Sequence, residues 1–262
     1  MIVIGERING MFKDVGKAIA GKDKNVVQDL AKKQVEAGSD VLDVNVGPSV
    51  PDAIEAMKWL VETVQQAVDV PLALDSTKPK AIEEGLKLVK KKAIINSTTA
   101  DKERLDVLLP LAKQYEAGLI GLTMGKSGIP RDKNERSEFA AQIVSNCMEA
   151  GLNPEDVYLD PIILPVNVTQ PQAKEVLESI REFKILSDPP PKTVVGLSNV
   201  SQGTQKRSLI NRIFLVMAVG MGLDAAILDP MDDELMDALI TSELILNRHI
   251  YCTSFLDAYR KK

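Results

Sequence analysis

Short apolar runs alternate with longer amphipathic stretches along the whole sequence, and this alternation restricts the possible folds more than any other feature. The apolar runs have strand length and lie at 2–8, 40–47, 71–75, 93–98, 119–125, 157–161, 193–199 and 225–230. Apolar residues at helical spacing occupy 23–38, 52–68, 78–90, 102–118, 137–151, 172–186, 206–222 and 232–247. Eight strand and helix pairs, each of about 30 residues, predict an α/β fold of the (β/α)8 TIM-barrel type, in which the loops after the strands carry the chemistry.

An open, doubly wound sheet is the alternative arrangement of the same elements. Such a sheet usually carries a G-x-G-x-x-G loop after its first strand, whereas here the first run continues as GERINGMF. The barrel is therefore favoured. The proline-rich segment Asp188–Lys192 resembles a domain linker, but the alternation of strands and helices continues across it. We predict a single barrel domain over residues 1–262.

Charge and composition argue against several classes of function. The net charge of -5 leaves no basic stripe for nucleic acid. No apolar run approaches the roughly 20 residues of a membrane span, and no signal-type leader precedes the first strand, so we expect a cytoplasmic protein without membrane association. The two cysteines, Cys147 and Cys252, and the single His249 cannot supply a disulfide framework or a zinc site. We predict no zinc, and we assign no residue as a metal ligand.

Polar residues stand where the predicted strands end, which is where a barrel would bring them together. They are Glu6, Asn9, Asp43, Asn45, Asp75, Asn96, Thr123, Asp160, Ser198, Asn199 and Asp229. The set contains neither histidine nor lysine, so it is poorly suited to Schiff-base chemistry or to a phosphate-rich substrate. It suits a neutral, flat, hydrogen-bonding heterocycle such as a pteridine.

One carboxylate can accept both the amide N–H and the exocyclic amine of a pteridine, as it does from a guanidinium group. Asp160 is our candidate for this contact, and Asn96 can both donate to and accept from the mixed ring nitrogens. Taken singly, Asp75 or Asp160 could instead cap the helix that follows it. The recurrence of such residues at several strand ends favours ligand binding for the set.

Five motifs at these positions resemble those of the pterin-binding barrels. They are GERING at Gly5–Gly10, ALDST at Ala73–Thr77, IINST at Ile94–Thr98, YLDP at Tyr158–Pro161 and GLSNVSQG at Gly196–Gly203. Each motif is short, but the five occur in order and the likeness covers essentially the whole chain. The family includes dihydropteroate synthase, the folate domain of cobalamin-dependent methionine synthase, and the methyltetrahydrofolate:corrinoid/iron-sulfur protein methyltransferases.

Within that family the chain looks most similar to the free-standing methyltransferases. A dihydropteroate synthase would be expected to carry a lysine near the seventh strand for its diphosphate-bearing substrate, but SNVSQG fills that stretch. A methionine synthase would need a zinc-thiolate domain, for which 262 residues and two cysteines leave no room. A dihydropteroate synthase-like enzyme and a non-catalytic folate-binding barrel remain the alternatives.

The resemblance implies transfer of the N5-methyl group of methyltetrahydrofolate to Co(I) of a corrinoid, or cobalamin, on a corrinoid/iron-sulfur protein in the reductive acetyl-CoA pathway. A homodimer is implied as well. A tertiary amine is a poor leaving group, so N5 must gain a proton or a strong hydrogen bond as the C–N bond breaks. The resemblance puts Asn199 next to N5, where its amide can accept from protonated N5 in the transition state.

The other site residues take their roles from the same resemblance. Asp75, Asn96 and Asp160 hold the pterin, and Asp75 also takes a catalytic part by ordering water near N5 and N8. Gly196 and Ser198 belong to the loop that carries Asn199. Gln202 and Arg207, further along this loop, are expected to face the corrinoid or the glutamate tail.

Overall fold

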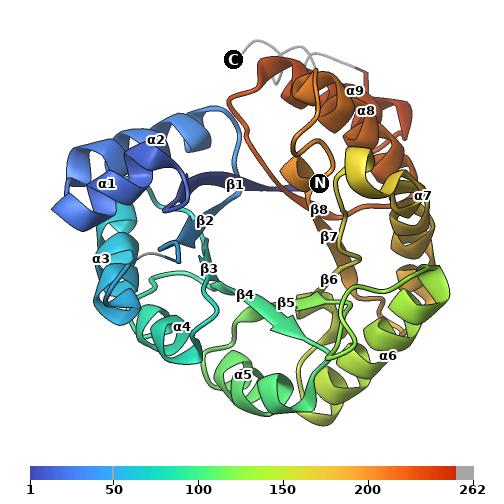
Figure 1. Cartoon of the computed structure of the whole chain (residues 1–262), viewed down its shortest axis with the longest axis horizontal. Helices are drawn as coiled ribbons and strands as arrows, with labels where there is room; N and C mark the ends of the chain where they lie inside the picture. Colours follow the sequence, from blue (N-terminus) through green and yellow to red (C-terminus); the bar gives the residue numbers. More distant parts are fainter. Residues whose placement is uncertain (49, 252–262) are drawn as a thin grey trace.

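Eight parallel strands form a closed barrel in the computed structural model, which describes residues 1–48 and 50–251 (Figure 1). The strands follow one another around the barrel in chain order, and β8 closes on β1. They are β1 (Ile2–Asn9), β2 (Val41–Asn45), β3 (Leu72–Asp75), β4 (Ile94–Thr99), β5 (Gly118–Leu122), β6 (Val157–Asp160), β7 (Lys192–Gly196) and β8 (Ala225–Leu228). The predicted (β/α)8 barrel is confirmed. Cys252, considered above, lies outside the described residues.

Helices surround the barrel (Figure 1). They are α1 (Lys13–Gly21), α2 (Lys24–Glu36), α3 (Ala53–Gln65), α4 (Pro79–Leu86), α5 (Lys102–Gln114), α6 (Lys133–Glu149), α7 (Val166–Glu182), α8 (Arg207–Gly220) and α9 (Asp233–Ile245), with short 3-10 turns η1 (Pro154–Asp156), η2 (Phe183–Ile185) and η3 (Leu197–Asn199). The sequence pattern does not predict α1. This helix buries only Val15, Ala18 and Ile19, a stripe too short to reveal a helical period.

Aspartate side chains begin several of the helices. Asp52, Asp132 and Asp232 accept hydrogen bonds from backbone N–H groups in the first turns of α3, α6 and α9. The helices that follow Asp75 and Asp160, α4 and α7, begin without a side-chain cap. The capping alternative for these two strand-end carboxylates is therefore wrong.

The strand period of two places a polar layer above an apolar floor inside the barrel. The floor consists of Ile4, Val41, Ala73, Ile94, Ile120, Tyr158, Val194 and Ala225, one residue from each strand. Two residues further along each strand stand Glu6, Asp43, Asp75, Asn96, Leu122, Asp160, Gly196 and Ile227, which line a cavity. The strand period therefore determines which side chain of each strand lines the cavity.

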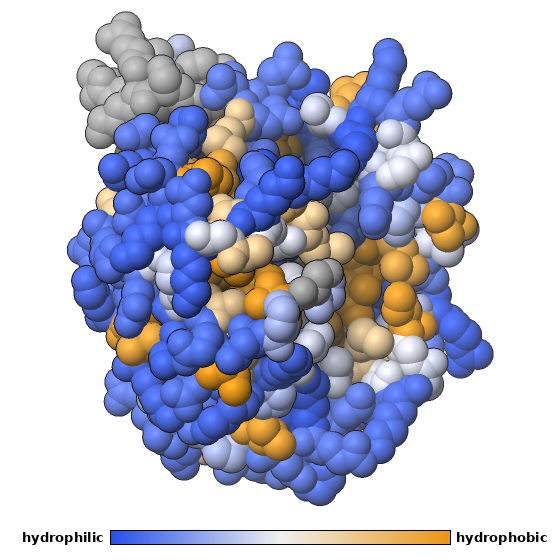
Figure 2. Space-filling view, turned by 60° about the vertical axis from the view of Figure 1, so that its left-hand side comes forward, coloured by the Kyte–Doolittle hydropathy of each residue, from blue (hydrophilic) through white to orange (hydrophobic). Residues whose placement is uncertain are grey.

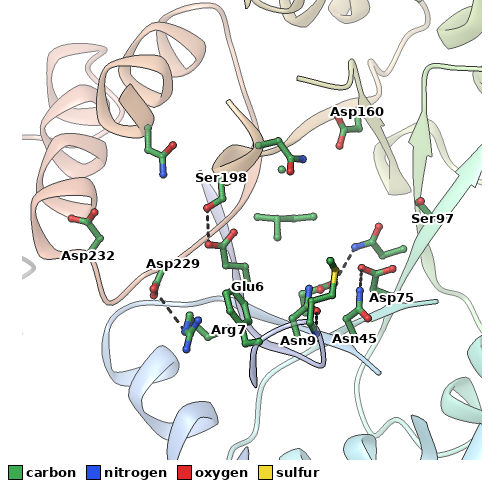
Figure 3. A pocket seen from close by; sticks show the side chains of 18 of the residues that line it. Glu6, Arg7, Asn9, Asn45, Asp75, Ser97, Asp160, Ser198, Asp229 and Asp232 are labelled. Carbon is green, nitrogen blue, oxygen red and sulfur yellow. Dashed lines mark hydrogen bonds and ion pairs between the residues drawn. The ribbon is translucent and has the colours of Figure 1, made fainter. Parts of the chain in front are cut away.

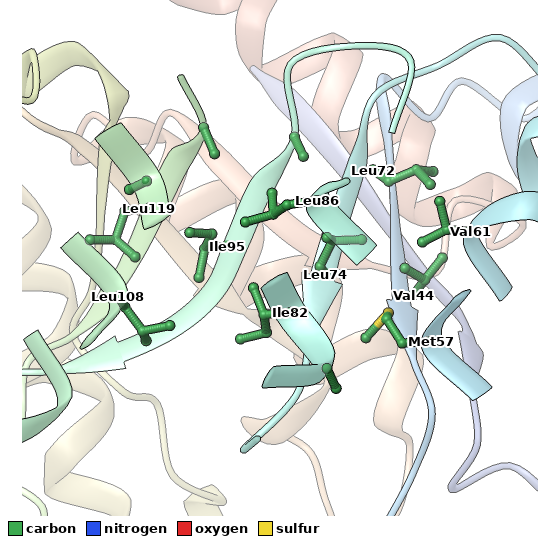
Figure 4. Packing of buried hydrophobic residues seen from close by; sticks show 14 of the residues in the cluster. Val44, Met57, Val61, Leu72, Leu74, Ile82, Leu86, Ile95, Leu108 and Leu119 are labelled. Carbon is green, nitrogen blue, oxygen red and sulfur yellow. The ribbon is translucent and has the colours of Figure 1, made fainter. Parts of the chain in front are cut away.

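The residues between these inward positions pack under the helices. Val44 and Leu74 belong to a buried cluster with Met57 of α3 and Ile82 of α4 (Figure 4). Burial of such a side chain stabilises the fold by roughly 1.5–3 kcal/mol. A β-carbon at Gly85 would come within 3.0 Å of Leu74 and Met57, so glycine allows α4 to pack this closely. This packing holds the strands, and with them the polar layer, in fixed register.

The outer surface differs from side to side. On the side of α1 to α3 it is mostly hydrophilic, with its apolar side chains in separate patches (Figure 2). Helix α8 is apolar from Ile213 to Gly220, and the helix exposes Leu209, Ile213, Val216 and Met217. Within residues 1–48 and 50–251, no helix combines the length and the apolar character needed to cross a membrane.

Candidate active site

The carboxyl ends of the strands open on a cavity of about 880 Å³, to which every strand contributes (Figure 3). Polar and charged side chains dominate its wall: Glu6, Arg7, Asn9, Asp43, Asn45, Asp75, Asn96, Ser97, Asp160, Ser198, Asn199, Arg207, Ser208, Asn211, Asp229 and Asp232. Apolar contacts come from Met11, Phe12, Leu122 and Ile227. A cavity of this size and lining fits a small molecule with many hydrogen-bonding groups.

Two pairs of amides and carboxylates form the wall on β2, β3 and β4. Asn45 Nδ2 donates to Asp75 Oδ2 at 2.5 Å, and Asn45 Oδ1 in turn accepts from the backbone N–H of Gly47. Asn96 Nδ2 donates to Asp43 Oδ1 at 3.0 Å. These contacts fix the orientation of both amides and leave carboxylate and carbonyl oxygens for a ligand.

Burial raises the pKa values of the carboxyl groups in this wall. Burial raises the pKa of Asp75 to about 6, against the lowering effect of the hydrogen bond from Asn45. Burial, together with the neighbouring Asp75 and Glu6 charges, raises the pKa of Asp43 well above its ordinary value, although the hydrogen bond from Asn96 opposes the shift. The Asp75 carboxyl group can therefore hold a proton near pH 6.

Asp160 ends β6 and is held by its own loop. Its Oδ1 accepts from the backbone N–H of Ile162 at 2.7 Å. Arg136 of α6, which is fully buried, donates from Nε to the carbonyl oxygen of Pro161 at 2.6 Å and so fixes the same loop. Burial raises the pKa of Asp160 to about 6, while the Ile162 N–H and the Arg136 charge act against the shift. Thr123 does not line the cavity: it donates to the carbonyl oxygen of Asp160.

A short turn carries Asn199 into the cavity beside Glu6. Ser198 and Asn199 belong to η3, directly after β7, and Ser198 Oγ donates to Glu6 Oε1 at 2.7 Å (Figure 3). Arg207 Nη2 donates to the Ser198 carbonyl oxygen from the other side. A β-carbon at Gly196 would stand 3.0 Å from Asn199 Nδ2, so glycine leaves room for the amide.

The structure brings together most of the predicted site residues. Asp75, Asn96, Asp160, Gly196, Ser198, Asn199 and Arg207 line the cavity. Gln202 is exposed and lies outside the cavity wall, and its expected contact with the corrinoid or the glutamate tail stays a prediction.

Sequence reasoning missed several wall residues. Asn211 and Ser208 on α8 are the clearest cases, and the spacing of Asn211 four residues after Arg207 is the signal that could have found it, since such residues share a helix face. Leu122 and Ile227 follow from the strand alternation. Among the described wall residues, Arg7 and Arg207 are the only cations, and Arg7 lies 4.0 Å from Asp229 and over the ring of Phe12.

Fold and cavity together define a class: a TIM barrel with a cavity rich in carboxyl and amide side chains at the carboxyl ends of its strands. The family model described as "Pterin binding enzyme" matches residues 12–229, and the chain belongs to this family. The family resemblance inferred from the five motifs is thus confirmed.

Curated relatives refine the assignment. A methylcorrinoid:tetrahydrofolate methyltransferase of Eubacterium limosum is 31% identical over 266 residues, which cover 100% of this chain and 97% of that protein. This identity over the full length places the chain in the same family of methyltransferases. The methionine synthase of Mycobacterium tuberculosis is 28% identical over 240 residues, covering 87% of this chain but 20% of the synthase.

Solved structures support the fold. Dihydropteroate synthase of Yersinia pestis superposes with a TM-score of 0.70 at 18% identity and 94% coverage of both chains. A dihydropteroate synthase of Clostridium difficile gives a TM-score of 0.67 at 20% identity, with coverage of 94% of this chain and 96% of the other. At these identities the likeness extends to the barrel alone.

Proposed function

We propose that this protein transfers the N5-methyl group of methyltetrahydrofolate to Co(I) of a corrinoid presented by another protein. One observation carries the proposal: the polar groups follow one another around the barrel in the order in which a pteridine presents its polar atoms. Asn96 on β4 and Asp75 on β3 lie on one side of β5, whereas Asp160 on β6 and Asn199 after β7 lie on the other side.

The polar atoms around a pteridine ring follow the same order as these residues around the barrel. With N3–H and the 2-amino group at the Asp160 carboxylate, the ring continues on one side through N1 to N8, toward Asn96 and Asp75. On the other side it continues through the 4-oxo group to N5, toward Asn199. Asp75 then lies where it can order water near N8 and N5, as the resemblance implies. A neutral pterin needs no lysine, and none is among the described wall residues.

Methyl transfer requires help at N5. The Co(I) electron pair forms the Co–C bond while the electrons of the C–N bond remain on N5, which takes a proton. Asn199 cannot titrate, and its amide oxygen accepts from protonated N5 more strongly as charge develops. Glu6 is the carboxyl group that can hold this proton, because burial raises the pKa of Glu6 despite the hydrogen bond from Ser198.

The partner is a protein that carries the corrinoid to the barrel mouth. We propose the corrinoid/iron-sulfur protein of the reductive acetyl-CoA pathway, with methyltetrahydrofolate as the donor. The name of the Eubacterium limosum relative puts methylcorrinoid first, which describes the opposite direction. Both directions pass through one transition state, so the same residues serve either.

A homodimer is the second part of the proposal, with α8 at its interface. Every residue of α8 from Ile213 to Gly220 is apolar or glycine, and an apolar helix surface is normally buried. Leu209, Ile213, Val216 and Met217 are nevertheless exposed on α8. A second copy of this chain is the partner we propose for this face. Light scattering on the parent protein and on Ile213→Lys tests it, and an unchanged mass would overturn the role of α8.

Equilibrium titration with methyltetrahydrofolate tests the pterin site. Binding at micromolar protein is the expected result, and absence of binding would overturn the whole proposal. Incubation with a dihydropterin diphosphate and 4-aminobenzoate distinguishes the dihydropteroate synthase alternative, which requires product from that pair. A non-catalytic barrel would bind methyltetrahydrofolate without demethylating it when cob(I)alamin is supplied.

A further inference from the structure

A nearly buried carboxyl group, that of Asp43, forms part of one wall of the cavity. Asp43 is only 3% exposed, and its Oδ1 accepts from Asn96 Nδ2 across the intervening strand β3. Ala73 is the register partner of Asp43 on β3, and its small side chain leaves room for the Asp43 and Asn96 side chains to meet. Within the described residues, Asn96 Nδ2 has Asp43 as its one side-chain partner, and Asn96 Oδ1 has no protein donor.

The contact decides which end of the Asn96 amide a ligand meets. An asparagine can turn its amide by 180° with little change in shape, so a partner that tells oxygen from nitrogen is needed to hold one orientation. The carboxylate oxygen of Asp43 accepts from the amide nitrogen and so turns the Asn96 carbonyl oxygen away from itself. Asp75, paired with Asn96 in the sheet register, adds a carboxylate beside it.

We propose that Asp43 is a positioning and specificity-determining residue, which presents the Asn96 carbonyl oxygen to the ligand and thereby selects reduced over fully oxidised pterins. The inference deepens the proposed function and rests on it. A tetrahydropterin carries N8–H, a donor that suits the acceptors of Asn96 and Asp75. A fully oxidised pterin has a lone pair at N8 instead, and this lone pair would face acceptor oxygens.

The test is the ratio of dissociation constants for folic acid and tetrahydrofolate, measured by calorimetry. Asp43→Asn keeps the size of the side chain but can pair with either end of the Asn96 amide, so Asn96 is free to turn and donate to N8 of folic acid. We expect this variant to lower the preference for tetrahydrofolate about tenfold, the effect of one hydrogen bond.

A pair of control variants separates positioning from stability. The double variant Asp43→Asn with Asn96→Asp exchanges the two groups. The carboxylate at position 96 then accepts from the amide at position 43 through one oxygen and presents its other oxygen to the ligand. This exchange should restore the preference for tetrahydrofolate to within about threefold of the parent. Asp224→Asn removes the ion pair with Lys184 at the amino end of the barrel, far from the cavity mouth, and should lower the melting temperature without changing the ratio.

The outcomes are distinct. A lowered ratio in Asp43→Asn, restored by the exchange, supports the inference. An unchanged ratio in a folded Asp43→Asn overturns it while leaving the proposed function intact. If the single variant does not fold, the exchanged pair decides, because a ratio near one in that protein also overturns the inference. Failure of the parent to bind either folate overturns the proposed function and this inference with it.

Discussion

Ser198 Oγ donates a hydrogen bond of 2.7 Å to Glu6 Oε1 and so joins the first strand of the barrel to the turn after the seventh, 192 residues away in sequence. The contact fixes the turn from which Asn199 enters the cavity. It also gives the half-buried Glu6 carboxyl group a hydrogen-bond donor, and this hydrogen bond opposes the rise in the pKa of Glu6 that burial causes.

Ser198→Ala should slow methyl transfer about tenfold with little change in folate affinity, because one hydrogen bond that positions the turn is lost. Rapid-mixing rates and equilibrium titration on the same preparation measure the two effects. Ser145→Ala on the exposed face of α6 is the matched control, since its hydroxyl donates to the exposed Glu149 of the same helix. An unchanged rate in Ser198→Ala would show that the contact to Glu6 has no part in catalysis.

Asn199→Ala should lower the rate of methyl transfer roughly 100-fold, as expected for loss of a group that stabilises the transition state. The dissociation constant for methyltetrahydrofolate should change by less than about fivefold. Stopped-flow absorbance of cob(I)alamin gives the rate, and calorimetry gives the affinity. A variant that retains the parental rate with unchanged affinity would remove Asn199 from the mechanism.

Gly196→Ala should reproduce part of the Asn199→Ala defect, because the added β-carbon would stand 3.0 Å from Asn199 Nδ2. We expect the transfer rate to fall about tenfold while the fold is kept. Gly21→Ala at the end of α1 is the control, since a β-carbon there meets no atom within 4 Å. If Gly196→Ala transfers methyl groups at the parental rate, the glycine is not needed to place the amide.

Asp160→Asn should stabilise the protein in a manner that depends on pH. Burial raises the pKa of Asp160 from 3.8 to about 6, so the folded state holds its proton more tightly than the unfolded state. The resulting stabilisation is complete below about pH 4 and is lost as the pH rises through about 6. At about pH 8 the variant should exceed the parent by on the order of 2–3 kcal/mol in the free energy of unfolding.

Urea unfolding of parent and variant at both ends of that pH range measures this difference. A difference that does not change with pH would contradict the assignment. The same variant should bind tetrahydrofolate more weakly, since an amide accepts the two pterin donors less well than a carboxylate. Stability would then rise while affinity falls, which is the pattern of a binding group held in an unfavourable environment.

Much of the barrel and most of its cavity follow from local sequence patterns. The strand alternation locates Asp75, Asn96 and Asp160, because each of them stands two residues beyond an apolar floor residue. Helix α1 escapes prediction because its buried stripe is three residues long.

The pairings inside the cavity could not be predicted, because they join residues that only the closed barrel brings together. Asn96 and Asp43 lie 53 residues apart and on strands that are not neighbours, and no local period connects them. Asn211 is a different case: it reaches the cavity from α8, and its spacing of four residues from Arg207 is a local signal that could have identified it.

The most direct test of the central claim is a methyl-transfer assay with methyltetrahydrofolate and cob(I)alamin, with the protein present or absent. The account predicts that catalytic amounts of the protein convert cob(I)alamin to methylcobalamin with formation of one tetrahydrofolate per cobalt, and that Asn199→Ala abolishes most of this conversion. A protein that binds methyltetrahydrofolate but leaves the rate at the uncatalysed level, with cob(I)alamin or with a corrinoid protein, would contradict it.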